Sequence, residues 1–172
     1  MGSSGNDTLD GHLGADTMTG GNGNDVYVVD NAFDRVVETS TSTSQIDTVQ
    51  TSVSWTLGAN LENLVLTGVS GINGTGNERQ NFITGNAANN VLNGAAEADS
   101  MSGGDGNDTY YVDNAGDSVI EINSNAVAGG IDSVHSSLAA HTLANNVERL
   151  YIDSTGAANG TGNALDLSLI HI

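Results

Sequence analysis

The chain has 172 residues, with three Lys and Arg against 21 Asp and Glu, and a formal net charge of −18. This imbalance argues against nucleic acid and anionic membranes as partners, because both would repel so acidic a protein. The absence of cysteine excludes disulfides and thiolate metal sites. No apolar run approaches the roughly 20 residues of a membrane helix, so we expect no membrane insertion.

The first periodic segment covers residues 2–37, where one pattern recurs every nine residues. Its clearest copy is Gly20–Val28, with the sequence GGNGNDVYV. Position 4 is glycine in the first three copies, and position 8 is apolar in all four. Position 6 is acidic throughout, at Asp7, Asp16, Asp25 and Asp34. A fixed period of this kind predicts a repeat architecture for the whole segment.

A second block covers residues 76–120 in the same register, and its position-6 residues are Asn81, Asn90, Asp99, Asp108 and Asp117. The segments after the blocks also correspond: Glu38 matches Glu121, and residues 46–49 match residues 131–134. The chain is therefore a duplicated unit. We predict one continuous solenoid with a first block and spacer at 1–75, a second block and spacer at 76–162, and a truncated or non-native tail at 163–172.

Each nonapeptide combines a glycine-rich turn with three residues that alternate polar and apolar, as in a short strand with one buried face. Two nonapeptides then complete one coil of about 18 residues, so that motif n stacks on motif n+2. We therefore predict an all-β parallel solenoid with position-8 side chains inside. The expected ladders are Leu9–Tyr27, Met18–Val36, Ile83–Met101–Val119 and Leu92–Tyr110. So thin a core needs another source of stability, because ordering the backbone costs about 1–2 kcal/mol per residue. One buried apolar side chain in nine residues does not offset this cost.

The stacking places two position-6 side chains at the same edge, and carboxylate and carbonyl oxygens are the ligands that Ca²⁺ prefers. We predict several Ca²⁺ ions, at Asp7/Asp25, Asp16/Asp34 and Asp99/Asp117. The pairs Asn81/Asp99 and Asn90/Asp108 carry one charge each and are expected to be weaker or vacant. The alternative is that these residues only form Asx-turns. Carboxylate ligation also predicts that calcium-linked stability is lost below pH about 4.

Gly20–Val28 and Gly103–Tyr111 resemble the repeats-in-toxin (RTX) calcium-binding motif at every defined position, and Gly11–Thr19 resembles it with His12 in place of the second glycine. The resemblance implies a right-handed parallel β-roll that folds on binding calcium, in a protein secreted by a Gram-negative bacterium through a type I channel. It also implies ligation by the carboxylates of Asp7, Asp16, Asp25, Asp99 and Asp108. The implied carbonyl ligands surround Gly5, Gly14, Gly21, Gly23, Gly104 and Gly106.

The chain departs from this pattern at three turns of the second block, where Arg79, Ala88 and Glu97 replace the position-4 glycine. The first coils of that block are therefore expected to be calcium-free. Glu97 is either a compensating ligand or a solvated surface charge. A further motif begins at Gly162, but its position 6 is Leu167.

No His-Glu-x-x-His or Gly-x-Ser-x-Gly motif occurs, so we expect no catalytic residues and no enzyme activity. The favoured hypothesis is a monomeric, non-catalytic calcium-binding module of a larger secreted protein. One alternative is a carbohydrate-binding accessory module of an enzyme, with an extracellular polysaccharide or the parent's catalytic domain as partner. The other is a calcium-independent solenoid with a structural or adhesive role.

Overall fold

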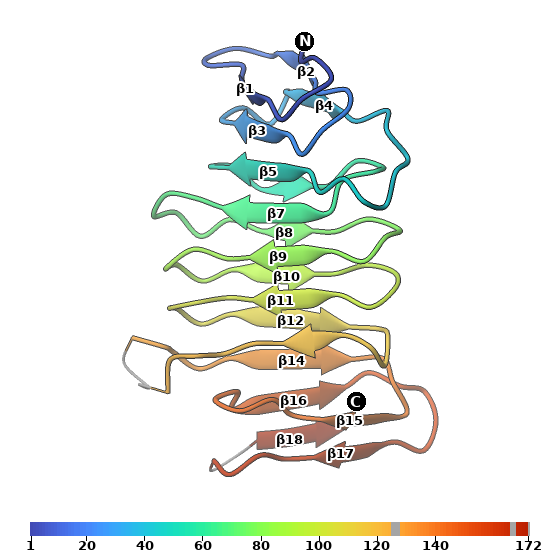
Figure 1. Cartoon of the computed structure of the whole chain (residues 1–172). Coiled ribbons are helices and arrows are strands. Elements are labelled where there is room, and N and C mark those ends of the chain that lie inside the picture. The colour runs from blue at the N-terminus through green and yellow to red at the C-terminus, as the bar shows by residue number, and fades with distance from the viewer. Residues whose placement is uncertain (125–127, 166–167, 172) are drawn as a thin grey trace.

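The computed structural model describes residues 1–124, 128–165 and 168–171, and every regular element in these ranges is a β-strand. The strands wind into a column of stacked coils that advances from one terminus towards the other (Figure 1). One face is a parallel sheet of β1 (Thr8–Asp10), β3 (Val26–Val29), β5 (Thr48–Thr51), β7 (Asn63–Leu66), β9 (Phe82–Thr84), β11 (Ser100–Ser102) and β13 (Ser118–Val119).

The opposite face is a second parallel sheet of β6 (Trp55–Thr56), β8 (Gly74–Thr75), β10 (Val91–Asn93), β12 (Thr109–Val112), β14 (Ser133–Ser136), β16 (Arg149–Ile152) and β18 (Ser168–His171). Two shorter sheets complete the coils. They pair β2 (Thr17–Thr19) with β4 (Arg35–Val37), and β15 (Ala140–Thr142) with β17 (Asn159–Thr161). The predicted all-β parallel solenoid is confirmed.

The register of the strands also confirms that motif n stacks on motif n+2. Thr8 pairs with Val26 and Val91 pairs with Thr109, a spacing of 18 residues in both blocks. All the predicted position-8 pairs are direct register partners. The spacers continue the column with coils of other lengths, because Val26 pairs with Thr48 and Thr48 with Asn63.

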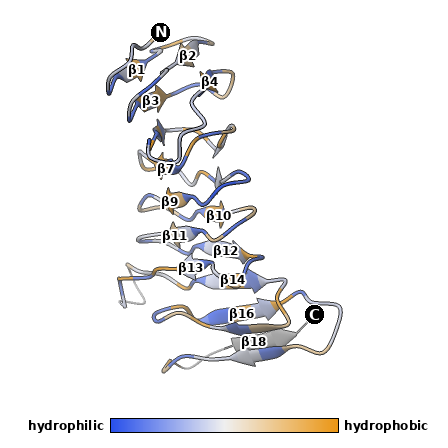
Figure 2. Cartoon of the chain, turned by 45° about the vertical axis from the view of Figure 1, so that its right-hand side comes forward, coloured by the Kyte–Doolittle hydropathy of each residue, from blue (hydrophilic) through white to orange (hydrophobic). Residues whose placement is uncertain are grey.

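The core is a single narrow line of apolar side chains between the two faces, and the hydropathy of the chain varies along every coil (Figure 2). The position-8 residues Tyr27, Leu92, Met101 and Tyr110 are fully buried. Their strand neighbours point outward because successive side chains of a strand alternate between faces. A motif coil therefore buries about two large apolar side chains, as the sequence predicts.

Corresponding strands of the two halves lie in opposite large sheets. β3 belongs to the first large sheet, whereas its counterpart β12, 83 residues later, belongs to the second. This follows because β12 is the ninth strand after β3, and an odd number of strands amounts to a half-integral number of coils. The corresponding glycine turns before β3 and β12 therefore precede strands of opposite sheets.

No helix in the described residues is long and apolar enough to cross a membrane. The end of the chain continues the fold, because β18 pairs in parallel with β16. The assignment of a truncated or non-native tail stays a prediction about origin. Leu167, the position-6 residue of the last motif, lies outside the described residues.

Candidate metal centres in the glycine-rich turns

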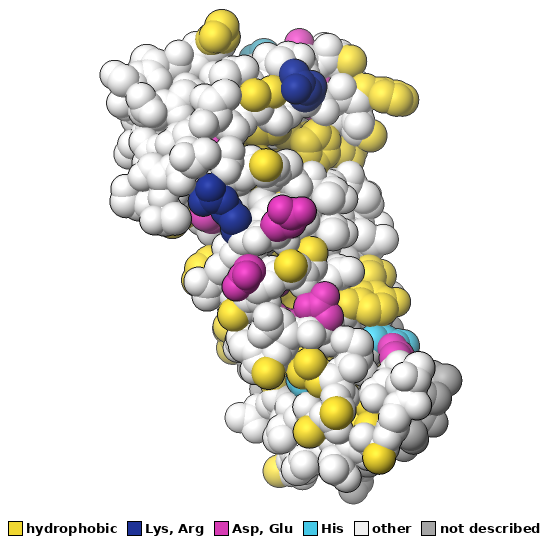
Figure 3. Space-filling model, turned by 90° about the vertical axis from the view of Figure 1, so that its right-hand side faces the viewer, with side chains coloured by type: hydrophobic (Ala, Val, Ile, Leu, Met, Phe, Trp, Pro, Cys, Tyr) yellow, Lys and Arg dark blue, Asp and Glu magenta, His cyan; other side chains and the backbone are white. Residues whose placement is uncertain are grey.

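Nine Asp and Glu side chains are buried among the described residues, out of 21 in the chain. Acidic side chains are almost never buried unless they are paired or bind a cation. The face in Figure 3 shows the consequence: its few charged side chains are scattered, and most of the surface is uncharged. Much of the negative charge therefore lies inside the column, at the edges where the coils turn.

The position-6 carboxylates form a hydrogen-bonded ladder along these edges. Oδ1 of each Asp accepts the backbone N–H of the position-6 residue one coil earlier, at 2.7 to 3.0 Å. The acceptors are Asp25, Asp34, Asp99, Asp108 and Asp117, and the donors are Asp7, Asp16, Asn81, Asn90 and Asp99. The structure thus brings together all five predicted pairs, through a backbone donor and a carboxylate acceptor.

The second carboxylate oxygen divides these residues into two groups. Oδ2 is buried without a hydrogen-bond partner in Asp16, Asp25, Asp99 and Asp108. In the other three it accepts local backbone N–H groups, from Ser3 to Asp7, from Asn31 to Asp34, and from Asp113 and Asn114 to Asp117. The donors in this second group lie three or four residues before the Asp, so these bonds are not Asx-turns, in which the donor lies two residues later. The unpartnered oxygens of the first group need another source of positive charge.

The first glycine of the motif makes room for each unpartnered oxygen. A Cβ atom on Gly20, Gly94 or Gly103 would overlap the carboxylate of the Asp five residues later. Only glycine leaves this space next to the carboxylate. Gly76 and Gly85 make the same room beside Asn81 and Asn90, so it is the unsatisfied carboxylate oxygen that indicates a cation.

The other motif glycines bring backbone carbonyls into the same turns. Gly14, Gly21, Gly23, Gly104 and Gly106 all have positive φ, which favours glycine. A Cβ on Gly21 would lie 2.6 Å from the carbonyl oxygen of Ser3, and one on Gly23 would lie 2.5 Å from that of Gly5. Carbonyl oxygens and carboxylates thus converge, and this all-oxygen donor set fits Ca²⁺ better than Zn²⁺.

The first turns of the second block satisfy their carbonyls in a different way. The Nδ2 amide of Asn77 donates to the carbonyls of Gly58 and Leu61, both at 2.7 Å. Asn86 donates in the same way to the carbonyls of Thr67 and Ser70. Amide hydrogens here occupy carbonyls that a cation would otherwise bind, which agrees with the expectation of calcium-free coils.

Two position-6 amides extend this pattern. Asn81 donates to the carbonyls of Leu61 and Glu62, and Asn90 donates to the carbonyl of Ile72. Asn90 is thus a hydrogen-bond donor to the preceding coil. Glu97 is exposed with a φ of 72°, which favours the solvated-charge interpretation over ligation.

Burial raises the pKa of two position-6 acids in the second block, Asp99 and Asp108. Desolvation raises the pKa of Asp99 to about 6 and that of Asp108 to about 7. The nearby carboxylates of Asp117 and Asp132 raise them further, although the hydrogen bonds from backbone N–H groups oppose this. These acids therefore need a proton or a cation in the folded state at neutral pH.

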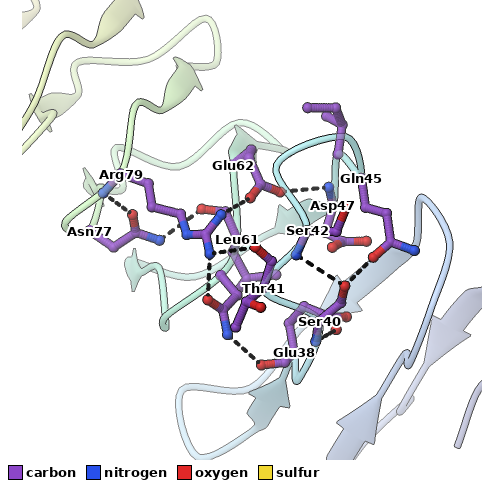
Figure 4. A network of polar contacts seen from close by, with 12 residues as sticks. Glu38, Ser40, Thr41, Ser42, Gln45, Asp47, Leu61, Glu62, Asn77 and Arg79 are labelled. Atoms are coloured by element: carbon purple, nitrogen blue, oxygen red, sulfur yellow. Dashed lines mark hydrogen bonds and ion pairs between the residues drawn. The ribbon is translucent and has the colours of Figure 1, made fainter.

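Sequence reasoning missed that the ladder continues beyond the motifs. Asp25 N–H donates to Oδ1 of Asp47, and Asp47 N–H donates to Oε2 of Glu62, whose carboxylate also faces Arg79 (Figure 4). The second half repeats the pattern through Asp108, Asp132 and Glu148. The signal was present in the matched residues 46–49 and 131–134, but these residues lie outside the nine-residue register of the motif blocks.

Comparisons with known proteins agree with this geometry. A family model of the RTX calcium-binding nonapeptide repeat matches residues 1–31 and 75–120, with four copies. Two curated relatives from Rhizobium meliloti (strain 1021) are each 38% identical, namely endo-1,3-1,4-beta-glycanase ExsH over 92 residues and endo-1,3-1,4-beta-glycanase EglC over 85 residues. These alignments cover 53% and 49% of this chain.

The chain spans only about a fifth of the length of these relatives, 19% of the first and 18% of the second. No solved structure matches the chain. The matched residues include the turns in which the buried Asp oxygens and the motif glycines meet. The match to the RTX calcium-binding nonapeptide repeat model therefore falls on residues 1–31 of the first periodic block and on the second block.

Proposed function

We propose that this chain is a non-catalytic calcium-binding β-roll module of a secreted bacterial protein, which folds and gains stability when Ca²⁺ binds. The observation that carries the proposal is the set of buried, unpartnered Oδ2 atoms on Asp16, Asp25, Asp99 and Asp108. RTX repeats bind calcium and are typical of secreted bacterial proteins, which supports the same proposal.

The ions would lie between stacked turns, held by position-6 carboxylates and turn carbonyls. In the first block the proposed pairs are Asp7/Asp25 and Asp16/Asp34, with carbonyls around Gly5, Gly14, Gly21 and Gly23. In the second block they are Asp99/Asp117 and Asn90/Asp108, with carbonyls around Gly104 and Gly106. When bound, Ca²⁺ supplies the positive charge that the few basic residues of this chain do not provide.

The test is a calcium titration of the purified chain, followed by circular dichroism in the far ultraviolet. We expect strand signal to appear with added Ca²⁺ and to disappear with a chelator, with Mg²⁺ at the same concentration as the matched control. A chain that is equally folded and equally stable in chelator and in calcium would refute the proposal. It would favour a calcium-independent structural solenoid instead.

A second candidate is a carbohydrate-binding accessory module in a monomeric segment of a larger glycan-active enzyme. One surface feature supports it: Tyr111, His135 and Tyr151 stack across β12, β14 and β16, with ring centroids 5.3 and 4.5 Å apart. Asp113 and Asp153 flank this ladder in a shallow pocket. The similarity to two glycanases supports a glycan as the ligand.

Affinity electrophoresis in a gel containing β-1,3-1,4-glucan tests this candidate. Retardation that Tyr111→Ala abolishes is the expected result, with Phe82→Ala as control because Phe82 is also exposed but lies on β9 of the other large sheet. Equal mobility with and without the glucan would argue against it. The rings cover one another's faces, which leaves mainly their edges for a sugar, so this candidate ranks second.

A further inference from the structure

Two buried clusters each join one position-6 Asp to two acids that occupy no position 6 of the motifs. One consists of Asp25, Glu38 and Asp47, and one carboxylate oxygen from each lies within 4.8 Å of the other two. The other consists of Asp108, Glu121 and Asp132, with the same spacing. All six side chains are buried, with exposed fractions between 0% and 7%. Glu38, Asp47, Glu121 and Asp132 do not belong to a position-6 site.

The contacts of the first cluster leave one oxygen without a partner at its centre. Tyr27 donates its hydroxyl to Oε2 of Glu38 at 2.8 Å, and Ser40 donates its backbone N–H to Oε1 at 2.7 Å. Oδ1 of Asp47 accepts the N–H of Asp25 at 2.7 Å. Oδ2 of Asp25 is buried and has no hydrogen-bond partner.

The second cluster repeats these contacts. Tyr110 donates its hydroxyl to Oε1 of Glu121, and Oδ1 of Asp132 accepts the N–H of Asp108 at 2.7 Å. Here two buried oxygens have no partner, Oδ2 of Asp108 and Oε2 of Glu121. The loop between Glu121 and Asp132 is two residues longer than that between Glu38 and Asp47, yet the three acids meet in the same way.

No positive side chain neutralises either cluster within the described residues. The ion pairs there are His12 with Asp10, Arg79 with Glu62, and His135 with Asp153, and none involves the six acids. In Figure 4, Arg79 forms an ion pair with the carboxylate of Glu62, and this carboxylate accepts the backbone N–H of Asp47. Arg79 therefore neutralises Glu62, the next acid along the ladder, and forms no ion pair with the cluster.

We infer that each cluster is a separate Ca²⁺ site, formed by Asp25, Glu38 and Asp47 in the first half and by Asp108, Glu121 and Asp132 in the second. Each site would lie near the end of a motif block, where the glycine turns are followed by a spacer coil. The donors are all oxygen, which suits Ca²⁺ and not Zn²⁺. Burial leaves little room for the waters that Mg²⁺ retains, which favours Ca²⁺ again.

This inference rests on the proposed function, because it assumes a chain that binds calcium in its turns as well. The test counts bound ions by native mass spectrometry of the whole chain in calcium. Glu38→Gln and Glu121→Gln are expected to lose one ion each, and the double variant two. Glu78→Gln, which makes the same change at an exposed position, is the matched control and should lose none.

A second pair of variants distinguishes the loss of an ion from a failure to fold. Asp47→Asn and Asp132→Asn keep an oxygen to accept the N–H groups of Asp25 and Asp108, and each should also lose one ion. Glu38→Gln combined with Asp47→Asn should still lose only one, because both residues serve one site. In calcium-depleted buffer Glu38→Gln should raise the melting temperature, since it removes a buried charge that no cation balances.

The outcomes separate the two proposals. An unchanged ion count in all four single variants, with calcium still bound by the wild-type chain, overturns the inference and leaves the turn sites intact. A wild-type chain that binds no calcium overturns the proposed function itself. A loss of two ions in the combined Glu38 and Asp47 variant would place these residues in different sites and would also overturn the inference.

Discussion

Asn90 donates its backbone N–H to Oδ1 of Asp108 at 2.7 Å, across a step of 18 residues that closes one coil. The other oxygen of Asp108 is buried without a partner, and Asn90 uses its own side-chain amide as a donor to the carbonyl of Ile72. Oδ1 of Asp108 thus holds two coils together through a hydrogen bond, and its Oδ2 is available to a cation. Asn81 likewise donates its side-chain amide to carbonyls of the preceding coil, those of Leu61 and Glu62.

Substituting Asp108 with Asn should remove calcium-dependent stability and leave the calcium-free chain folded to the same extent or more. The amide oxygen still accepts the N–H of Asn90, but the negative ligand is lost. One site filled at a hundredfold excess over its dissociation constant contributes about 2.7 kcal/mol. Urea unfolding in calcium measures the change. Asp30→Asn is the control, because Asp30 is exposed and belongs to none of the proposed sites.

Substituting Gly103 with Ala should destabilise the chain by about 1–3 kcal/mol, the usual cost of overpacking a buried site. The new methyl group would overlap the carboxylate of Asp108 and the hydroxyl of Tyr110. Gly156→Ala is the control, since a Cβ there meets nothing within 4 Å. Thermal unfolding of the two variants in calcium checks this. Equal melting temperatures would show that the cradle beside Asp108 is not needed.

Substituting Asn77 with Ala should weaken the fold equally with and without calcium. The change removes three hydrogen bonds, two donated to the carbonyls of Gly58 and Leu61 and one accepted from the N–H of Arg79. The carbonyl of Leu61 still accepts from the amide of Asn81, but the carbonyl of Gly58 and the N–H of Arg79 lose these partners. The expected loss is about 1–3 kcal/mol. Urea unfolding in both buffers gives the comparison. A loss confined to the calcium buffer would mean that this turn holds an ion after all.

The calcium-free chain should become less stable as pH rises from 5 to 8. Burial raises the pKa of Asp47 to about 6 and those of Glu121 and Asp132 to about 7, above their ordinary values near 4. A raised folded-state pKa means that the contribution is complete below the unfolded value and is lost as pH rises through the folded value. Thermal melts in calcium-depleted buffer across this range measure the slope.

In the presence of calcium, the stability of the chain should instead rise with pH, because protons and Ca²⁺ compete for the same oxygens. The apparent calcium affinity is expected to fall as pH drops below about 7, the value to which burial raises the pKa of Asp108. Calcium titrations at pH 8 and pH 5.5 test this. The sequence alone places the loss near pH 4, and burial moves it upward. An affinity that is unchanged between these two values would contradict carboxylate ligation.

Much of the fold follows from the sequence because the nonapeptide is a local rule. Glycine at fixed offsets and an apolar residue at position 8 specify a turn and a short strand, so stacking by n and n+2 and the pairing of Leu92 with Tyr110 could be predicted. The candidate sites were predictable only in part. That Asp25 and Asp108 keep an oxygen free while Asp34 and Asp117 do not depends on local backbone donors, which the nine-residue pattern does not encode.

The sequence by itself determined the solenoid, its period, its duplication and the acidic edge, since each of these depends on residues close together in one repeat. Only the tertiary structure decided which acids meet. Glu38 reaches Asp25 and Asp47 because a spacer coil closes over the last motif turn, and a contact across coils of unequal length has no period to reveal it. The structure also placed corresponding strands of the two halves, such as β3 and β12, on opposite faces, because the duplicated unit has an odd number of strands.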